Sequence, residues 1–428
     1  MNKQIYFLLI LIGLLIGCRK EEINPPPVIS LIEPYTNKHY NVFDTVFYKA
    51  SAQDQNGVEY ISASIVNDFL SVVTTTNTQQ FNTLSAQVES YLVLDDIHLT
   101  SGTYYLMITA SDGNNVTRSY TKISIIEEPL VLKNILIFSE QSSSQTEVYS
   151  LDSNLFVSKF TYPQGFQSAA INSYNQQIHI LGTQGSMSTF TTDDYTEEWY
   201  INQINNPLQS FYGQVDVIDN TTFVSFGSGY IKGYDKFGVV RKSFNTQGIQ
   251  YQPSIFYKWN YYLIAFEKAI GNQDNRIDVF YYGAGGKKIS FYVDFDVVQF
   301  FYYREDKIMM WGNKNGKAKL YELSLLYNFI DEIKTLPLEQ LFSAIQVEEN
   351  IFLAAIGNDI YHFNSNTNSL NIYSAGVHAD LLKFEELNSV FFIVNQNTLT
   401  VKAYPQNIEL LTTTHNQPIK AIEFLYNK

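Results

Sequence analysis

The second part of the chain, from about residue 132 to residue 428, repeats one short pattern, and this repeat constrains the fold most strongly. In each copy an apolar segment leads into a tight polar turn and then into a second apolar segment. Residues 255–257, Asn260 and residues 262–266 form one such copy. The turns recur roughly every 40 residues, and two further strand-like segments follow each one. Four antiparallel strands per repeat predict a β-propeller, in which each repeat is one blade.

The two ends of this region predict how the propeller closes. The first copy begins at residues 134–138, which resemble the second segment of a repeat, and the chain ends at residues 419–427, which resemble a first segment. Together they complete one blade, which protects two strand edges that would otherwise be exposed. The count predicts a seven-bladed propeller closed by the C-terminal strand. Six or eight blades, or two stacked sandwiches, are the alternatives.

Composition agrees with an all-β chain and gives no signature of a propeller family. Tyr (32 residues) and Phe (30 residues) make up most of the aromatic content of 15%, and aromatic residues are common in half-buried strands. No Trp-Asp dipeptide closes each repeat, and the chain has a single Gly-Gly, at Gly285-Gly286. The repeats therefore resemble neither WD40 nor kelch repeats.

The N-terminus has the pattern of a secretory signal that ends at the only cysteine of the chain. Lys3 precedes an apolar run over residues 5–17, and Leu15-Ile16-Gly17-Cys18 follows the pattern of a cleavage site. This segment resembles the lipobox of bacterial lipoproteins. The resemblance implies a signal peptide at residues 1–17 and a lipidated Cys18 that anchors the protein to a membrane. An uncleaved transmembrane helix needs about 20 apolar residues, which this run does not have.

The residues after Cys18 suggest where the anchored protein faces. Lys20, Glu21 and Glu22 resemble the surface-export signal of Bacteroidota lipoproteins, which implies an outer-membrane location facing the cell exterior. A solvated tether is the alternative interpretation of this charged run. The prolines of Asn24-Pro25-Pro26-Pro27 predict an extended spacer, so residues 18–27 are expected to form a tether.

Residues 28–127 predict a separate β-sandwich. Ser101-Gly102-Thr103-Tyr104-Tyr105 and Ala110-Ser111-Asp112-Gly113 resemble the last hairpin of bacterial immunoglobulin-like domains, and the length suits such a sandwich. Asp54-Gln55-Asn56-Gly57 predicts a turn. Asp54 and Asp112 are interpreted as turn residues rather than as calcium ligands, because acids are not clustered around them. Glu127-Glu128-Pro129 marks the boundary with the propeller at 132–428.

The sequence contains no recognisable catalytic or metal-binding motif. The six histidines are far apart and have no zinc-ligand spacing, and no Gly-x-Ser-x-Gly segment occurs. Asp193-Asp194 and Glu197-Glu198 are adjacent pairs whose side chains point to opposite faces of a strand, so solvated acids are expected. No catalytic residue, metal or cofactor is therefore predicted. The net charge of −14 disfavours binding to nucleic acid.

The generic binding site of a propeller is the mouth of its central channel. One polar residue lies near the start of each predicted innermost strand. We expect these residues to ring the channel mouth, with Asp380 and Lys420 able to pair; the alternative is that they only solvate a water-filled channel. They are Ser168, Gln214, Ser254, Gln299, Ser343, Asp380 and Lys420. On the opposite face, Trp259 is interpreted either as an exposed contact for protein or glycan or as ordinary core.

These features predict a cell-surface lipoprotein that acts as a non-enzymatic binding or scaffold module. The expected partner is a protein of the outer membrane, within a membrane complex. The alternatives are a glycan-binding component of a surface uptake system and, with less support, a polysaccharide lyase or hydrolase. A fold alone does not decide among these functions.

Overall fold

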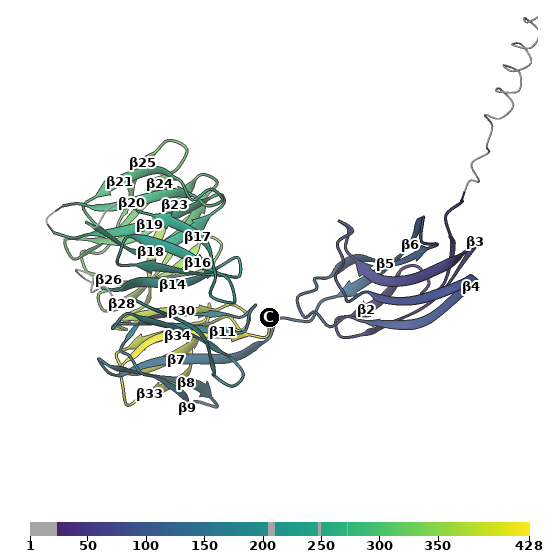
Figure 1. Ribbon diagram of the computed structural model, residues 1–428. Coiled ribbons are helices and arrows are strands. Elements are labelled where there is room, and N and C mark those ends of the chain that lie inside the picture. The colour runs from purple at the N-terminus through teal and green to yellow at the C-terminus, as the bar shows by residue number, and fades with distance from the viewer. Residues whose placement is uncertain (1–23, 204–209, 247–249, 272) are drawn as a thin grey trace, which may run out of the picture. The chain divides into compact units, whose positions relative to one another are not determined.

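The computed structural model describes residues 24–203, 210–246, 250–271 and 273–428, and the regular elements in these ranges are β-strands. Contacts divide the chain into two units between Pro129 and Leu130 (Figure 1). This division directly follows the Glu127-Glu128-Pro129 segment. In the described ranges no helix is long and apolar enough to span a membrane.

The N-terminal unit is built from six strands. Their order is β1-β3-β5-β6-β2, with β4 also paired to β3. All of these pairs are antiparallel except that of β2 with β6, which is parallel. The strands are β1 (Val28–Glu33), β2 (Lys38–Asn41), β3 (Thr45–Val66), β4 (Asn77–Val93), β5 (Gly102–Ser111) and β6 (Val116–Ile126).

Strand β3 corrects one sequence prediction. The predicted turn over residues 54–57 does not end the strand; instead, the pairing of β3 with β4 shifts register between Gln53 and Val58. Gly57 has a φ of 105°, which a residue with a side chain rarely adopts. The first part of β3 pairs with β1 and the last part with β5. The polar segment is therefore a bulge that lets one strand serve two sheet partners.

The core of this unit follows the two-residue period of its strands. Val46, Tyr48 and Ala50 are buried, whereas the residues between them are not. Ahead of β1, Asn24 donates a hydrogen bond of 2.7 Å from Nδ2 to Asp112 Oδ2, and Pro27 is buried. Residues 24–27 are thus bound to the folded unit, which shortens the free spacer that the sequence predicts.

The described residues of the C-terminal unit form seven four-stranded antiparallel sheets. We number them 1 to 7 by their innermost strands, starting with the sheet β34-β7-β8-β9 and continuing in chain order. The innermost strands are β34 (Ile419–Tyr426), β10 (Phe166–Asn172), β14 (Tyr212–Ile218), β18 (Tyr251–Trp259), β22 (Asp296–Arg304), β26 (Leu341–Glu348) and β30 (Leu381–Glu385). The second strands are β7 (Leu132–Ser142), β11 (Gln177–Gly182), β15 (Thr221–Phe226), β19 (Tyr262–Ala269), β23 (Lys307–Lys314), β27 (Ile351–Ile356) and β31 (Val390–Asn395).

The two outer layers of each sheet follow in the same order. The third strands are β8 (Gln145–Asp152), β12 (Ser186–Thr191), β16 (Tyr230–Tyr234), β20 (Asn275–Tyr281), β24 (Lys317–Ser324), β28 (Asp359–Asn364) and β32 (Thr398–Ala403). The outermost strands are β9 (Leu155–Tyr162), β13 (Glu197–Asn202), β17 (Val240–Asn245), β21 (Lys287–Val293), β25 (Phe329–Thr335), β29 (Ser369–Ser374) and β33 (Ile408–Thr414).

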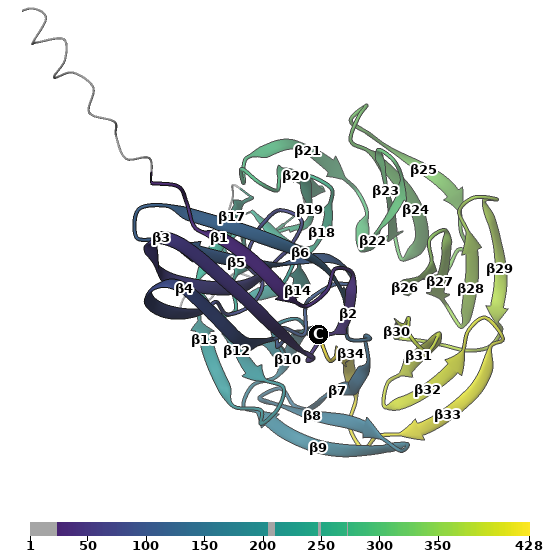
Figure 2. The same ribbon diagram turned by 90° about the vertical axis from the view of Figure 1, so that its right-hand side faces the viewer.

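The sheets circle a common axis and form a β-propeller (Figure 2). Each innermost strand contacts the innermost strands of both neighbouring sheets, including β30 with β34 and β34 with β10. In sheet 1 the last strand of the chain pairs antiparallel with β7, so that Ile422 lies opposite Ile137. This is the pairing that the sequence predicts for the two ends of the region.

Burial explains why the second strands are the most apolar segments. Every residue of β11, and nearly every residue of β15 and β27, is buried, because each strand is covered by neighbouring sheets on both faces. The outermost strands are largely exposed. The turns after the innermost strands use residues that tolerate a positive φ, such as Asn220 (60°) and Asn260 (48°).

Candidate functional site

The innermost strands share a local distortion at the place where the sequence predicts the channel-mouth residues. Six of them have one extra residue near their start, which interrupts the pairing with the second strand and re-aims a side chain. The register shifts lie between Phe166 and Ser168, Tyr212 and Val215, Pro253 and Ile255, Val297 and Gln299, Leu341 and Ser343, and Ile419 and Ala421. The predicted residues of these strands lie at or beside the bulges.

Three of the predicted residues use their side-chain oxygen to join neighbouring sheets. In each case the oxygen accepts a hydrogen bond from a backbone N–H of the next innermost strand. The bonds run from Val215 N to Ser168 Oγ (3.3 Å), from Phe256 N to Gln214 Oε1 (3.1 Å) and from Leu382 N to Ser343 Oγ (3.0 Å). These oxygens therefore stabilise the ring, because they satisfy N–H groups of innermost strands, which have a partner strand of their own sheet on one side only.

The expected pair between Asp380 and Lys420 is wrong. Lys420 Nζ lies 2.9 Å from Glu140 Oε2, on the neighbouring strand of its own sheet. Asp380 accepts a hydrogen bond of 2.7 Å from Gln396 N and lies 3.1 Å from His378 Nε2. Both residues find nearer partners within their own sheets, so neither reaches across the junction between sheets 7 and 1.

The remaining two predicted residues differ in their surroundings. Ser254 Oγ donates a long hydrogen bond of 3.4 Å to the carbonyl oxygen of Phe266 in its own sheet. Gln299 lines the central cavity, as do Ser168, Gln214, Ser343 and Lys420. The structure thus brings five of the seven predicted residues to one cavity.

The central cavity encloses about 520 Å³ and contains charged groups as well as amides and hydroxyls. Lys383 Nζ lies 2.8 Å from Glu423 Oε1 of the neighbouring sheet. Burial raises the pKa of Asp216 to about 6, although the N–H of Val217 and the charge of Lys383 act in the opposite direction. The charges of the cavity are partly balanced by one another, which suits a small polar molecule or water rather than a strongly charged ligand.

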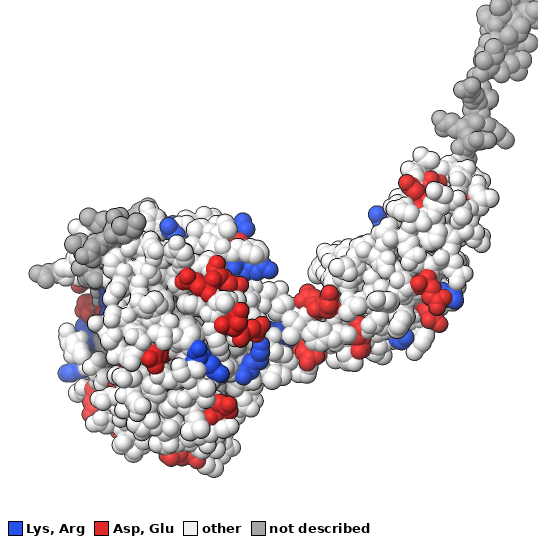
Figure 3. Space-filling model, turned by 60° about the horizontal axis from the view of Figure 1, so that its bottom comes forward, with Lys and Arg blue, Asp and Glu red and all other residues white. Residues whose placement is uncertain are grey.

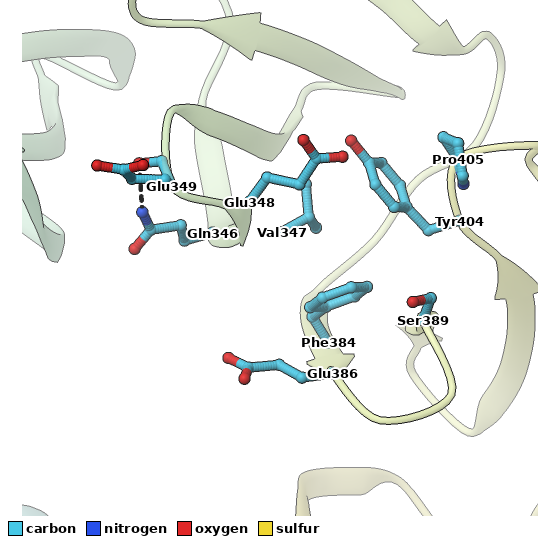
Figure 4. Close-up of a pocket in the computed structure, with 9 residues that line it drawn as sticks. All are labelled: Gln346, Val347, Glu348, Glu349, Phe384, Glu386, Ser389, Tyr404 and Pro405. Carbon is cyan, nitrogen blue, oxygen red and sulfur yellow. Dashed lines mark hydrogen bonds between the residues drawn. The ribbon is translucent and has the colours of Figure 1, made fainter.

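A second cavity, of about 510 Å³, lies between sheets 6 and 7 (Figure 4). We call it the acidic groove. Phe384 and Tyr404 form an aromatic wall, with ring centroids 5.7 Å apart and planes at 80°. Its lining consists of Gln346, Val347, Glu348, Glu349, Phe384, Glu386, Ser389, Tyr404 and Pro405.

Three carboxylates of the acidic groove lack a cation. Glu348, Glu349 and Glu386 are exposed, and no ion pair within the described ranges includes any of them. The carboxylate of Glu348 and the hydroxyl of Tyr404 point toward each other (Figure 4). Burial, followed by the hydrogen bond and charge of Glu348, raises the pKa of Tyr404. Tyr404 is therefore a neutral hydrogen-bond donor beside uncompensated negative charge.

Sequence reasoning missed the acidic groove because it considered only the central channel. A signal was present: Glu348-Glu349 and Glu385-Glu386 lie where two consecutive innermost strands end and their turns begin. Like charges in adjacent turns that face one junction repel each other, which is unfavourable for stability. Acid pairs in neighbouring repeats are thus a useful sign of a site between blades.

The residues considered for catalysis have structural explanations. His179 is fully buried between two hydroxyls, with Nδ1 2.8 Å from Thr189 Oγ1 and Nε2 2.8 Å from Thr222 Oγ1 of the next sheet. Burial lowers its pKa to about 3, so the ring is neutral. The acids at 193–194 and 197–198 are exposed, as predicted. Across the described ranges no group of three His, Cys, Asp or Glu residues is arranged to hold a metal ion.

Trp259, Asp54 and Asp112, which the sequence analysis singled out, also have local roles. Trp259 is half-buried and stacks on Tyr262, with centroids 6.1 Å apart and planes at 8°, which favours the core interpretation. Asp54 Oδ1 accepts a hydrogen bond of 2.7 Å from Asn56 N. Backbone hydrogen bonds, led by that of Asn115, lower the pKa of Asp112 to about 2. Both carboxylates therefore stabilise local backbone turns.

Most of the face shown in Figure 3 is uncharged, with acidic and basic side chains scattered over both units. This pattern agrees with a charged content of 16%. The residues predicted for lipidation and export, Cys18, Lys20, Glu21 and Glu22, lie outside the described ranges.

Comparison with known proteins gives similarity to solved structures only. No family model matches the chain, and no curated protein matches it. One similar structure is the WD40 domain of Neurospora crassa Pan2, with 11% sequence identity, a TM-score of 0.46, and coverage of 61% of this chain and 78% of that one. Another is a chain of a nidogen/laminin complex, with 8% identity, a TM-score of 0.42, and coverage of 69% and 99% respectively.

Proposed function

We propose that this protein is a lipid-anchored, non-enzymatic module of the bacterial cell surface that binds a protein partner. The observation that carries the binding role is the acidic groove, an open cavity whose three carboxylates have no cation within the described ranges. Stability alone does not favour such an arrangement, because unpaired like charges repel one another. A partner that neutralises them provides a reason for the cluster to exist.

The location rests on the sequence. Leu15-Ile16-Gly17-Cys18 resembles a lipobox, and the Lys20-Glu21-Glu22 run resembles a Bacteroidota surface-export signal. We propose that Cys18 is lipidated and anchors the protein in the outer membrane, facing the exterior. A polar body of two units that the lipid holds at the surface suits a scaffold within an outer-membrane complex.

The proposal also includes a specific fold type for each of the two units. We infer that the N-terminal unit is an immunoglobulin-like sandwich; the parallel pairing of β2 with β6 and the division of β3 between two partners support this. We infer that the C-terminal unit is a seven-bladed propeller. Its seven four-stranded sheets and the pairing of β34 with β7 support the count.

Glycan binding is the second candidate function. Tyr261 is 82% exposed and Tyr327 is 70% exposed, and exposed aromatic rings provide apolar faces on which sugar rings pack. A component of a surface uptake system would use such platforms. Binding of soluble polysaccharides that Tyr261→Ala and Tyr327→Ala abolish would favour this candidate over the protein partner.

Anchoring is tested by labelling cells that express the full chain with an alkyne fatty acid. We expect label on the wild-type protein and none on Cys18→Ser, because only the thiol is acylated. External protease added to intact cells should degrade the wild-type protein. An unlabelled wild-type protein, or one that the protease reaches only after lysis, contradicts the proposed location.

The partner is tested by affinity purification of the tagged full chain from detergent-solubilised outer membranes. We expect a membrane protein to co-purify in a fixed ratio to the tagged chain. Recovery of the chain alone, at protein and salt concentrations that preserve other membrane complexes, would contradict the proposed protein-binding role.

A further inference from the structure

The junction between sheets 3 and 4 corresponds to the junction between sheets 6 and 7 that holds the acidic groove, and the two differ in one decisive way. Strand register identifies the corresponding positions at the two junctions, because corresponding residues have the same place relative to the turn after the innermost strand. The corresponding pairs are Asp219 with Glu349, Lys258 with Phe384, and Tyr282 with Tyr404.

At the junction between sheets 3 and 4, the chain supplies its own cation. Lys258 Nζ lies 2.7 Å from Asp219 Oδ2 and 5.1 Å from the centroid of the Tyr282 ring. A second lysine, Lys242, has its Nζ 3.9 Å from the same centroid. An ammonium group is thus held between a carboxylate and an aromatic face, an arrangement that both charge pairing and cation–π attraction favour.

The acidic groove also has a carboxylate that faces its tyrosine, here that of Glu348 (Figure 4), but it has no lysine at the position of Lys258. Phe384 occupies that position, and Glu349 and Glu386 add further negative charge. Nearby cations have other partners: Lys383 Nζ lies 2.8 Å from Glu423, and Lys402 Nζ lies 3.1 Å from Asn407 Oδ1. The groove therefore has the carboxylate and the aromatic ring of a lysine site but no ammonium group, and a cavity of about 510 Å³ is open beside them.

We propose that the acidic groove binds a lysine or arginine side chain of the partner protein. The cationic head lies beside the carboxylate of Glu348, which points toward the Tyr404 hydroxyl (Figure 4), and its apolar stem packs on the rings of Phe384 and Tyr404. Long basic side chains have this amphipathic character, with an apolar stem and a charged tip. This inference rests on the proposed function, since it names the chemistry of the partner that function requires.

The direct test measures binding of a fluorescent acetyl-Gly-Lys-Gly-Lys-Gly amide to the full chain in detergent micelles. We expect the wild-type protein to bind this probe and Glu348→Gln/Glu349→Gln to bind it about tenfold more weakly, because charge-assisted contacts of about 1.4 kcal/mol are lost. The matched control is Asp331→Asn/Glu409→Gln, which removes the same charge from exposed positions on outermost strands. The control should bind like the wild type.

Two results overturn the inference. One is a wild-type protein that does not bind the lysine probe or binds an acetyl-Gly-Gln-Gly-Gln-Gly amide equally well. The other is an equal loss of binding in both double variants, which would show attraction to the net charge of −14 rather than to the groove.

A further variant, Phe384→Lys, introduces between sheets 6 and 7 the lysine that Lys258 provides between sheets 3 and 4. We expect it to abolish probe binding, because its ammonium group would occupy the position of the ligand. A folded Phe384→Lys protein that binds the probe as tightly as wild type overturns the inference; if this variant does not fold, the double variants decide.

Affinity purification separates this inference from the proposed function. If Glu348→Gln/Glu349→Gln recovers the membrane partner as well as the wild type does, the groove is not the contact and the protein-binding function stands. If the wild type recovers no partner although the probe binds in the groove, the proposed function fails while the chemistry of the groove stands.

Discussion

Two acid-rich places in the propeller differ in how their charge is balanced. In sheet 4, Glu267 and Asp278 are completely buried on neighbouring strands. Arg276 Nη2 lies 2.5 Å from Glu267 Oε2, and Lys287 Nζ contacts Asp278. In the acidic groove, three exposed glutamates have no such partners in the described ranges.

In the buried cluster, two cations of the same sheet lie against the two acids. Burial, followed by the charge of Asp278, raises the pKa of Glu267 to about 9, more than Arg276 lowers it. Glu267 is therefore protonated at neutral pH. The Asp278 carboxyl group lies between Arg276 and Lys287. The comparison teaches that the two buried acids are matched by cations of the chain itself, whereas the three glutamates that line one open cavity have no cation in the described ranges.

The largest effect is expected from removing the buried cation. Arg276→Met leaves the Asp278 carboxylate with only Lys287 and removes a donor to the backbone oxygen of Thr246. The free energy of unfolding should fall by about 3–5 kcal/mol, as for other broken buried pairs. Denaturant unfolding measures this effect. Arg241→Met breaks the largely exposed pair with Asp235 and should cost less than about 1 kcal/mol; equal losses would contradict the comparison.

The second effect depends on pH. Between about pH 5 and 8 the folded wild type keeps a proton on Glu267 that the unfolded chain has lost, so its stability falls as pH rises. Glu267→Gln has no such proton. The free energy of unfolding of this variant should therefore rise relative to wild type with increasing pH, by up to about 1.4 kcal/mol per pH unit. Parallel pH profiles of the two proteins would show that Glu267 is ionised in the folded state.

The third effect tests the hydrogen bonds between innermost strands. Ser343→Ala leaves the buried N–H of Leu382 without its acceptor, so we expect a loss of about 1–2 kcal/mol in unfolding free energy. Ser254→Ala is the matched control, because the Ser254 hydroxyl makes only a long bond of 3.4 Å within its own sheet. A control that destabilises the protein as much as Ser343→Ala would remove the distinction between the two serines.

The smallest effect is expected in the acidic groove. Glu348→Gln/Glu349→Gln removes repulsion and breaks no ion pair of the described ranges, so unfolding free energy should stay equal or rise by about 0.5 kcal/mol. Thermal unfolding at low and high salt measures the change, which salt should diminish. A loss of more than about 1 kcal/mol would mean that these glutamates support the fold.

The sequence predicted architecture better than side-chain partners. The period of the repeats and the spacing of their turns can be read from the sequence, so the four-strand repeats and the pairing of residues 419–426 with β7 could be predicted. Which hydroxyl meets which N–H depends on bulges, whose positions the sequence pattern does not fix. Ser343 was predicted from its position near the start of an innermost strand. Its hydrogen bond with Leu382 N could be found only once the strand register was known.

Charge pairing was the weakest part of the prediction for a similar reason. Asp380 and Lys420 belong to neighbouring sheets, but each has a closer partner in its own sheet, Gln396 and Glu140 respectively. The turn expected at residues 54–57 became a bulge, because β4 continues beside β3 past the polar segment. Local composition identifies polar or flexible positions, and three-dimensional neighbours decide their use.

The pairing of β34 with β7 has a consequence for biosynthesis. Three strands of sheet 1 are the first propeller strands to be made, whereas the fourth, β34, is made after the other six sheets. During translation the ring therefore stays open until β34 emerges, and β7 is exposed as an unpaired strand edge until then. A nonsense codon at position 419 would delete the whole of β34 and leave this edge permanently unpaired, although the other six sheets would be complete.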